Sequence, residues 1–120
     1  MPRVDVIFYK DADRKPVLDW LDEVKKQDKR AYAKCFVRIH RLGELGHELR
    51  RPEAEYLRDD IYEVRIKYGT VNYRILYFFY GQTACVLAHG LKKKSTVPDS
   101  EIEIALKRKA QFMNDPERHG

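Results

Sequence analysis

A glutamate, an arginine and a histidine are spaced along this chain so that together they could act on a phosphate group. Residues 61–94 contain three runs of alternating apolar and polar side chains, separated by two turn signals that each include a glycine. Folded as an antiparallel meander, these runs would place Glu63 opposite Arg74, and Arg74 opposite His89. The sequence therefore predicts an acid, a guanidinium and an imidazole in one row across three neighbouring strands.

This predicted row depends on the lengths of the two turns. It requires Tyr68-Gly69 and Gly81-Gln82 to be two-residue loops, because a slip of one residue sends every side chain of a strand to the other face. The same register places Arg65 diagonal to Arg74 on the same face. The plain alternative is a half-solvated face on which Glu63 and Arg74 form a cross-strand ion pair worth roughly a few tenths of a kcal/mol.

More cations follow the histidine along the chain. Arginine holds phosphate oxygens through two parallel hydrogen bonds, lysine attracts phosphate as a point charge, and histidine titrates near neutral pH. The catalytic candidates are Arg65, Arg74 and His89, and Glu63 is a possible general base. The candidates for binding RNA or another phosphate are Lys92, Lys93, Lys94 and Arg58. For Arg58 the alternative is a solvated position, because acids at 53–60 offset the arginines near it.

Cleavage of RNA by its own 2′-hydroxyl would use these residue types. The reaction needs a base at that hydroxyl, cations on the pentacoordinate phosphate and an acid at the leaving 5′-oxygen. It needs no metal, and no carboxylate cluster in the sequence suggests a metal site. The fingerprints of nucleotide-binding loops and of serine hydrolases are absent as well. We therefore expect a reaction without metal or cofactor.

Length and composition describe a single folded domain. A chain of 120 residues can bury a modest core, and its net charge of +5 suits an acidic partner such as nucleic acid without proving one. Cys35 and Cys85 stand alone and are expected to be buried thiols in a reducing cytoplasm. No apolar run approaches membrane-spanning length, and the N-terminus lacks the apolar core of a signal peptide.

The remaining segments would support the meander. Alternation of apolar and polar residues at 4–9 predicts a strand. Apolar residues at helical spacing then predict two consecutive helices, of which the first begins near Pro16. The second has Phe36 on its buried face and ends at Gly43 or Gly46. Residues 47–60 show little periodicity and are predicted to be a surface loop. A closing helix follows Val97, so that residues 1–113 form the domain. Residues 114–120 are expected to be a frayed polar tail.

This order of elements resembles the RelE/ParE toxin superfamily, and most closely its HigB-like, phage-derived branch. The resemblance covers most of residues 4–110 and is carried by the segments KPVLDWLDEV, LRDDIYEVRI, VNYRILYFF, VLAHGLKKKS and VPDSEIEIALKR. It implies an α+β RelE-like fold: an N-terminal strand, a helical hairpin, a three-stranded antiparallel meander and a C-terminal helix packed on the sheet. It also implies a toxin of a type II toxin–antitoxin pair. Many such toxins cleave mRNA in the ribosomal A site, and the partners implied are ribosome-bound mRNA and a cognate antitoxin, expected to be a helix-turn-helix protein.

Residue by residue, the resemblance reaches the same candidates. Arg65 matches the arginine of the family's E-x-R segment, and Arg74 matches the arginine in its Y-R-I-L-Y-F strand. His89 and the first two lysines after it match the family's H-G-F-x-K-K segment, with Leu91 where phenylalanine is usual. Several relatives also carry a catalytic tyrosine or histidine at the extreme C-terminus. Here the tail offers only His119, to which we assign no role, so the general base and acid remain open.

The sequence is also compatible with two other functions. A toxin of the ParE type poisons DNA gyrase by binding it and cleaves nothing, and fold alone cannot separate the two classes. The cluster of Arg65, Arg74, His89 and the lysines favours the ribonuclease, because a toxin that only binds protein does not need it. A degenerate member that binds RNA or its antitoxin without catalysis is the third possibility.

Overall fold

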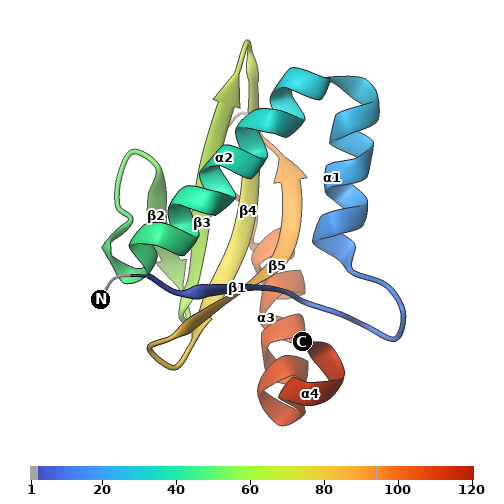
Figure 1. Cartoon of the computed structure of the whole chain (residues 1–120), viewed down its shortest axis with the longest axis vertical. Helices are drawn as coiled ribbons and strands as arrows, with labels where there is room; N and C mark the ends of the chain where they lie inside the picture. The colour runs from blue at the N-terminus through green and yellow to red at the C-terminus, as the bar shows by residue number, and fades with distance from the viewer. Residues whose placement is uncertain (1–2, 94) are drawn as a thin grey trace.

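The chain folds into a five-stranded mixed sheet with helices on both faces, so the predicted α+β class is confirmed. The computed structural model describes residues 3–93 and 95–120. The strands are β1 (Asp5–Phe8), β2 (Ala54–Arg58), β3 (Ile61–Tyr68), β4 (Val71–Tyr80) and β5 (Ala84–Lys92). The helices are α1 (Pro16–Gln27), α2 (Lys29–Leu45), the 3-10 turn η1 (Gly46–Glu48), α3 (Asp99–Asn114) and α4 (Pro116–His119). The strand order is β1-β5-β4-β3-β2, with β1 parallel to β5 and the other pairs antiparallel (Figure 1).

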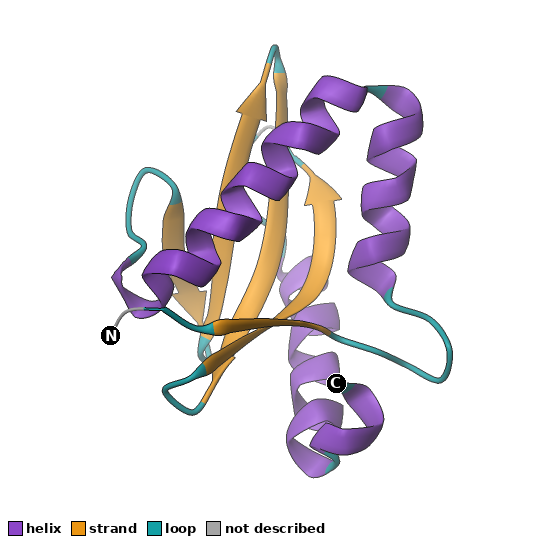
Figure 2. Ribbon diagram, in the orientation of Figure 1, coloured by secondary structure: helices purple, strands orange, loops and turns teal. Residues whose placement is uncertain are grey.

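The two faces of the sheet are covered unequally. The helical hairpin α1–α2 packs on one face over a core that includes Ile75 and Leu87. On the other face α3 packs over Leu76 and Phe78. Figure 2 shows α3 behind the lower part of the sheet, whereas the β3–β4 hairpin extends above it. Within residues 3–93 and 95–120, therefore, no helix covers the upper part of the α3 face.

Local sequence explains how the hairpin docks. Pro16 occupies the first turn of α1, where its missing N–H costs nothing, and the Asp28 carboxylate caps α2 by accepting hydrogen bonds from two backbone N–H groups. Trp20 of α1 lies flat against Gly90 of β5, where a Cβ atom would come within 2.4 Å of the indole ring. Any side chain at position 90 would therefore push α1 away from the sheet. No helix among the described residues is long and apolar enough to cross a membrane.

Two expectations about the fold are wrong. Part of the predicted loop 47–60 is β2, which adds a fourth strand to the meander at its edge. The predicted frayed tail 114–120 contains α4 instead, and His119 is buried there. The imidazole of His119 donates a hydrogen bond of 2.8 Å to the carbonyl of Lys10 and stacks on Tyr9. The C-terminus is thus fastened to the segment that follows β1.

The strand registers also differ from prediction. The first loop is Gly69-Thr70, so Arg65 lies opposite Arg74 and Glu63 lies opposite Leu76. The predicted pairing of Glu63 with Arg74 was wrong by two residues, a slip that keeps every side chain on its predicted face. Gly69 has a φ of +63°, as the first position of a type II′ turn requires.

Both cysteines are buried free thiols, as predicted. Burial raises the pKa of Cys35 from 9.0 to about 11 and that of Cys85 to about 12. We expect both thiols in the native protein to react far more slowly with a thiol reagent at about pH 8 than in denaturant. The two thiols make their full contribution to the free energy of unfolding below pH 9.0, where they are protonated in both the folded and the unfolded state. As the pH rises from 9.0 towards 11 and 12, the unfolded state loses these protons first, so the free energy of unfolding falls. Equal labelling of native and denatured protein would contradict this burial.

Candidate phosphate-binding site

An open pocket of about 330 Å³ lies on the uncovered part of the α3 face. Strands β3 and β4 supply most of its wall, the loop before β2 supplies one edge, and α2 contributes one side chain. The lining residues are Arg38, Pro52, Glu53, Arg65, Lys67, Asn72 and Arg74. Four cations thus line one pocket together with a single carboxylate.

A buried carboxylate lies behind the two arginines of the strands. Glu63 is only 1% exposed. Its Oε1 accepts a hydrogen bond of 2.7 Å from Nη1 of Arg74, and its Oε2 accepts bonds of 3.2 and 3.0 Å from Nε and Nη2 of Arg65. An unpaired charge at this depth would be costly, so Glu63 and the two guanidinium groups fix one another's positions. The expected ion pair between Glu63 and Arg74 is present, in a diagonal arrangement and with Arg65 as a third member.

Arg74 has an unused hydrogen-bond donor. The residue is 9% exposed, and its Nε is the one buried side-chain polar atom in the described part of the chain that has no partner. A buried donor left unpaired costs about 1–3 kcal/mol. Nε itself is covered by protein atoms, but Glu63 fixes the orientation of the guanidinium, and a guanidinium that is already oriented is suited to bind an anionic ligand through its other donors.

The charges around this pocket do not cancel. The carboxylates that contact its arginines are shared with outlying arginines, since Arg41 reaches Glu53 and Arg51 reaches Glu55. The basic members of the network are Arg38, Arg41, Arg51, Arg65, Lys67 and Arg74, and its acidic members are Glu53, Glu55 and Glu63. Six cations against three carboxylates leave three positive charges to attract phosphate.

His89 lies outside this pocket. The pairing of β4 with β5 shifts between Leu76 and Tyr77, where Ala88 of β5 is the extra residue of a bulge. Because the second loop also has three residues, His89 lies opposite Leu76. The prediction that His89 faces Arg74 was wrong, because Arg74 lies opposite Leu91. The acid, guanidinium and imidazole therefore do not form one straight row.

The imidazole of His89 is held by α3 instead. Its Nε2 lies 2.9 Å from Oε1 of Glu101, and its Nδ1 lies 3.4 Å from Nη1 of Arg108. A carboxylate can only accept, so in neutral His89 the proton sits on Nε2 and the basic lone pair is on Nδ1. Burial lowers the pKa of Arg108, which also donates to the carbonyl of Ala88. Only a long contact to Arg108 occupies the basic nitrogen.

The predicted RNA-binding cations have different surroundings. Lys92 points to the helical hairpin, where its Nζ lies 2.5 Å from Gln27 and over the ring of Tyr73. Lys93 lines a second pocket, of about 490 Å³, together with Asn72, which also lines the arginine pocket. Lys94 is outside the described residues. Arg58 is far more neutralised than predicted, because it contacts Asp59, Asp99 and Glu103.

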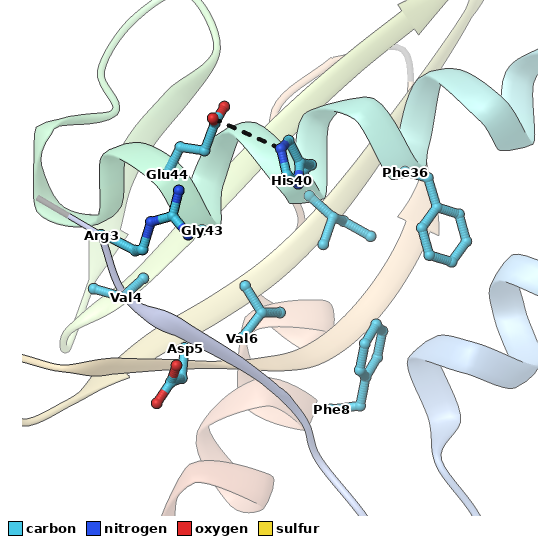
Figure 3. A pocket seen from close by; sticks show the side chains of 10 residues that line it. Arg3, Val4, Asp5, Val6, Phe8, Phe36, His40, Gly43 and Glu44 are labelled. Atoms are coloured by element: carbon cyan, nitrogen blue, oxygen red, sulfur yellow. Dashed lines mark ion pairs between the residues drawn. The ribbon is translucent and has the colours of Figure 1, made fainter.

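A third pocket, of about 370 Å³, lies between β1 and α2 and has a different character (Figure 3). Val6, Phe8 and Phe36 give it an apolar lining, and His40 pairs with Glu44 at its rim. Phe36, expected in the core, is 38% exposed. This pocket lacks the clustered cations of the arginine pocket, so we do not assign the chemistry to it. No three metal-binding side chains gather among the described residues.

Five residues of the arginine pocket were not predicted from the sequence as site residues: Arg38, Pro52, Glu53, Lys67 and Asn72. Arg38 is the one that comes from a helix. It belongs to α2, on the opposite layer, and reaches past the edge of the sheet to donate to the backbone carbonyl of Arg65. Helical periodicity marks it only as a polar residue on an amphipathic helix, so no signal in the sequence points to the pocket.

Comparison with known proteins identifies a family for this chain. A family model described as phage derived protein Gp49-like (DUF891) matches residues 22–110, from within α1 to within α3. The match includes every residue of the arginine pocket and His89. A search of curated proteins finds no match. Because the model covers well over half of the chain, this protein belongs to the phage-derived Gp49-like family, a RelE-like toxin family.

Proposed function

We propose that this protein is the toxin of a type II toxin–antitoxin pair and that it cleaves mRNA on the ribosome. The observation that carries the proposal is the uncovered pocket in which Arg65 and Arg74 converge on buried Glu63 while Nε of Arg74 lacks a partner. Membership in the Gp49-like family supports the toxin part of the proposal. Its cognate antitoxin would be a helix-turn-helix or acidic protein that covers or distorts this cationic surface.

The reaction proposed is transesterification by the RNA's own 2′-hydroxyl. The 2′-oxygen attacks phosphorus, the bond to the 5′-oxygen breaks, and the products carry a 2′,3′-cyclic phosphate and a 5′-hydroxyl. Arg65 and Arg74 would contact the phosphate oxygens, whose charge grows in the transition state. Glu63 already sets the orientation of both arginines, so their side chains need to move little when the RNA phosphate binds.

Proton transfer is assigned to His89 in this proposal. Nδ1 carries the lone pair when Glu101 holds the proton on Nε2, so Nδ1 is the ring nitrogen that can accept a proton. For this role Nδ1 must give up its 3.4 Å contact with Arg108. Glu63 is assigned to orienting the arginines rather than to acting as the base, because two guanidinium groups occupy both of its oxygens.

Induction of this chain in bacteria should stop growth, and co-expression of its antitoxin should relieve the arrest. Pulse labelling with methionine and with thymidine tests the target. We expect protein synthesis to fall first, with mRNA cuts inside coding regions. Early DNA damage signalling with intact messages would point instead to a gyrase poison of the ParE type. Unimpaired growth at a high level of soluble protein would favour a degenerate member of the family.

A further inference from the structure

We propose that Arg38 of α2 is a phosphate-contacting residue of the arginine pocket, placed to bind a phosphodiester of single-stranded RNA. The inference deepens the proposed function and rests on it for the identity of the ligand. It starts from the position of Arg38: this helical side chain lines the pocket together with the strand residues Arg65 and Arg74, although α2 covers the other face of the sheet.

The end of β2 explains how Arg38 comes to be there. The pairing of β2 with β3 begins at Ala54 and Val64, and the N–H of Arg65 donates to the carbonyl of Glu53. The carbonyl of Arg65 points to the same side of β3 as its N–H group. At this position β2 has not yet begun, so β2 offers no backbone N–H group to donate a hydrogen bond to this carbonyl. Nη1 of Arg38 supplies the missing donor. This bond holds the Arg38 guanidinium beside Arg65 at the pocket wall.

The charge of Arg38 is only partly compensated. Its Nε lies 3.5 Å from Oε2 of Glu53, but Arg41 contacts the same oxygen at 2.5 Å. Two guanidinium groups thus share one carboxylate, and the closer contact belongs to Arg41. Arg41 does not line the pocket, and its side chain is more exposed than that of Arg38. The excess positive charge of the pair is therefore available on the pocket side, at Arg38.

The ligand class follows from the shape and charge of this wall. Guanidinium groups bind phosphate oxygens with parallel hydrogen bonds, and the pocket opens on a sheet face rather than in a deep closed cavity. Asn72 lines both this pocket and the pocket of Lys93, so the two are neighbours and could hold successive phosphates of one strand. A flexible single strand can follow such a bent path with successive phosphates, whereas a small phosphorylated metabolite would use one end only.

Arg14 provides a control outside the pocket, because it lies on the loop before α1 and pairs with Asp19 on the surface. Arg38→Gln and Arg14→Gln each remove one arginine charge and one contact with a carboxylate, and only the first alters the arginine pocket. Binding is measured with a short, mixed-sequence single-stranded RNA carrying 2′-O-methyl groups, which block cleavage, over a range of salt concentrations and without ribosomes. Thermal unfolding of each variant shows that it is folded at the assay temperature.

We expect Arg38→Gln to reduce the slope of log K against log salt by about 0.7, the loss of one phosphate contact on a single strand. Arg14→Gln should keep the wild-type slope, and Arg38→Lys, which restores the charge, should recover most of it. A wild-type slope in Arg38→Gln, an equal loss in Arg14→Gln, or no binding of RNA by the wild-type protein would overturn the inference. If the wild-type protein bound RNA through Arg38 but cut no mRNA on ribosomes, the proposed function would fail and the phosphate site would stand.

Discussion

Replacing Arg74 with lysine is expected to lower the rate of mRNA cleavage by about 10²–10³ while the protein stays folded. Lysine keeps a positive charge for buried Glu63 but cannot reproduce the guanidinium, including the Nε that lacks a partner in the free protein. Removing one preorganised donor from a phosphate site costs a rate factor of this size. Cleavage of mRNA on purified ribosomes, measured at saturating protein, gives the rate.

Arg14→Lys is the matched control for this substitution. Arg14 lies on the loop before α1 and pairs with Asp19 on the surface. We expect cleavage by this variant to match the wild type. Arg74→Ala is a poorer test, because it removes a partner from a carboxylate that is 1% exposed, and breaking such a buried pair costs about 3–5 kcal/mol. A folded Arg74→Lys protein that cleaves at the wild-type rate would remove Arg74 from the site.

Glu63→Gln should damage both stability and cleavage. The amide keeps the volume of the side chain but loses the charge that holds Arg65 and Arg74, so the free energy of unfolding should fall by about 3–5 kcal/mol. That is a large part of the 5–15 kcal/mol typical of a domain, so activity must be measured at a temperature where the variant is folded. Urea unfolding gives the stability, and the ribosome assay gives the rate.

The pH–rate profile separates the two roles considered for Glu63. If Glu63 orients the arginines, Glu63→Gln should lower the rate at every pH and leave the shape of the profile unchanged. If it is the general base, the acidic limb of the profile should disappear. Glu44→Gln, in which the substituted carboxylate pairs with His40 on the surface, is the control and should change neither quantity appreciably.

The sequence was sufficient for the arrangement of most elements, because long segments with strong periodicity identify themselves. It was insufficient for β2, whose five residues lie at an edge with only Ala54 buried, so that no clear alternation marks it. A turn signal was nevertheless present. Asp59 and Asp60 form the loop between β2 and β3 with φ values of 50° and 63°, and aspartate is one of the few residues that tolerate this conformation.

The site was only partly predictable for a related reason. The face on which Glu63, Arg65 and Arg74 lie follows from alternation alone and survived an error of two residues in register. The position of His89 depends on a bulge and a three-residue loop, and a regular meander contains neither. Arg38 reaches the pocket through tertiary packing across the edge of the sheet, which local sequence does not encode.

The most direct test of the central proposal is to map the ends of mRNA fragments produced on ribosomes by the purified protein. The mRNA is translated with and without the toxin in a reconstituted system, and the 5′ and 3′ ends of the fragments are identified chemically. Transesterification by the 2′-hydroxyl predicts cuts within the coding region that leave a 2′,3′-cyclic phosphate and a 5′-hydroxyl, and that disappear in Arg74→Lys. Intact mRNA in the presence of folded wild-type protein, or fragments ending in a 5′-phosphate, would contradict it.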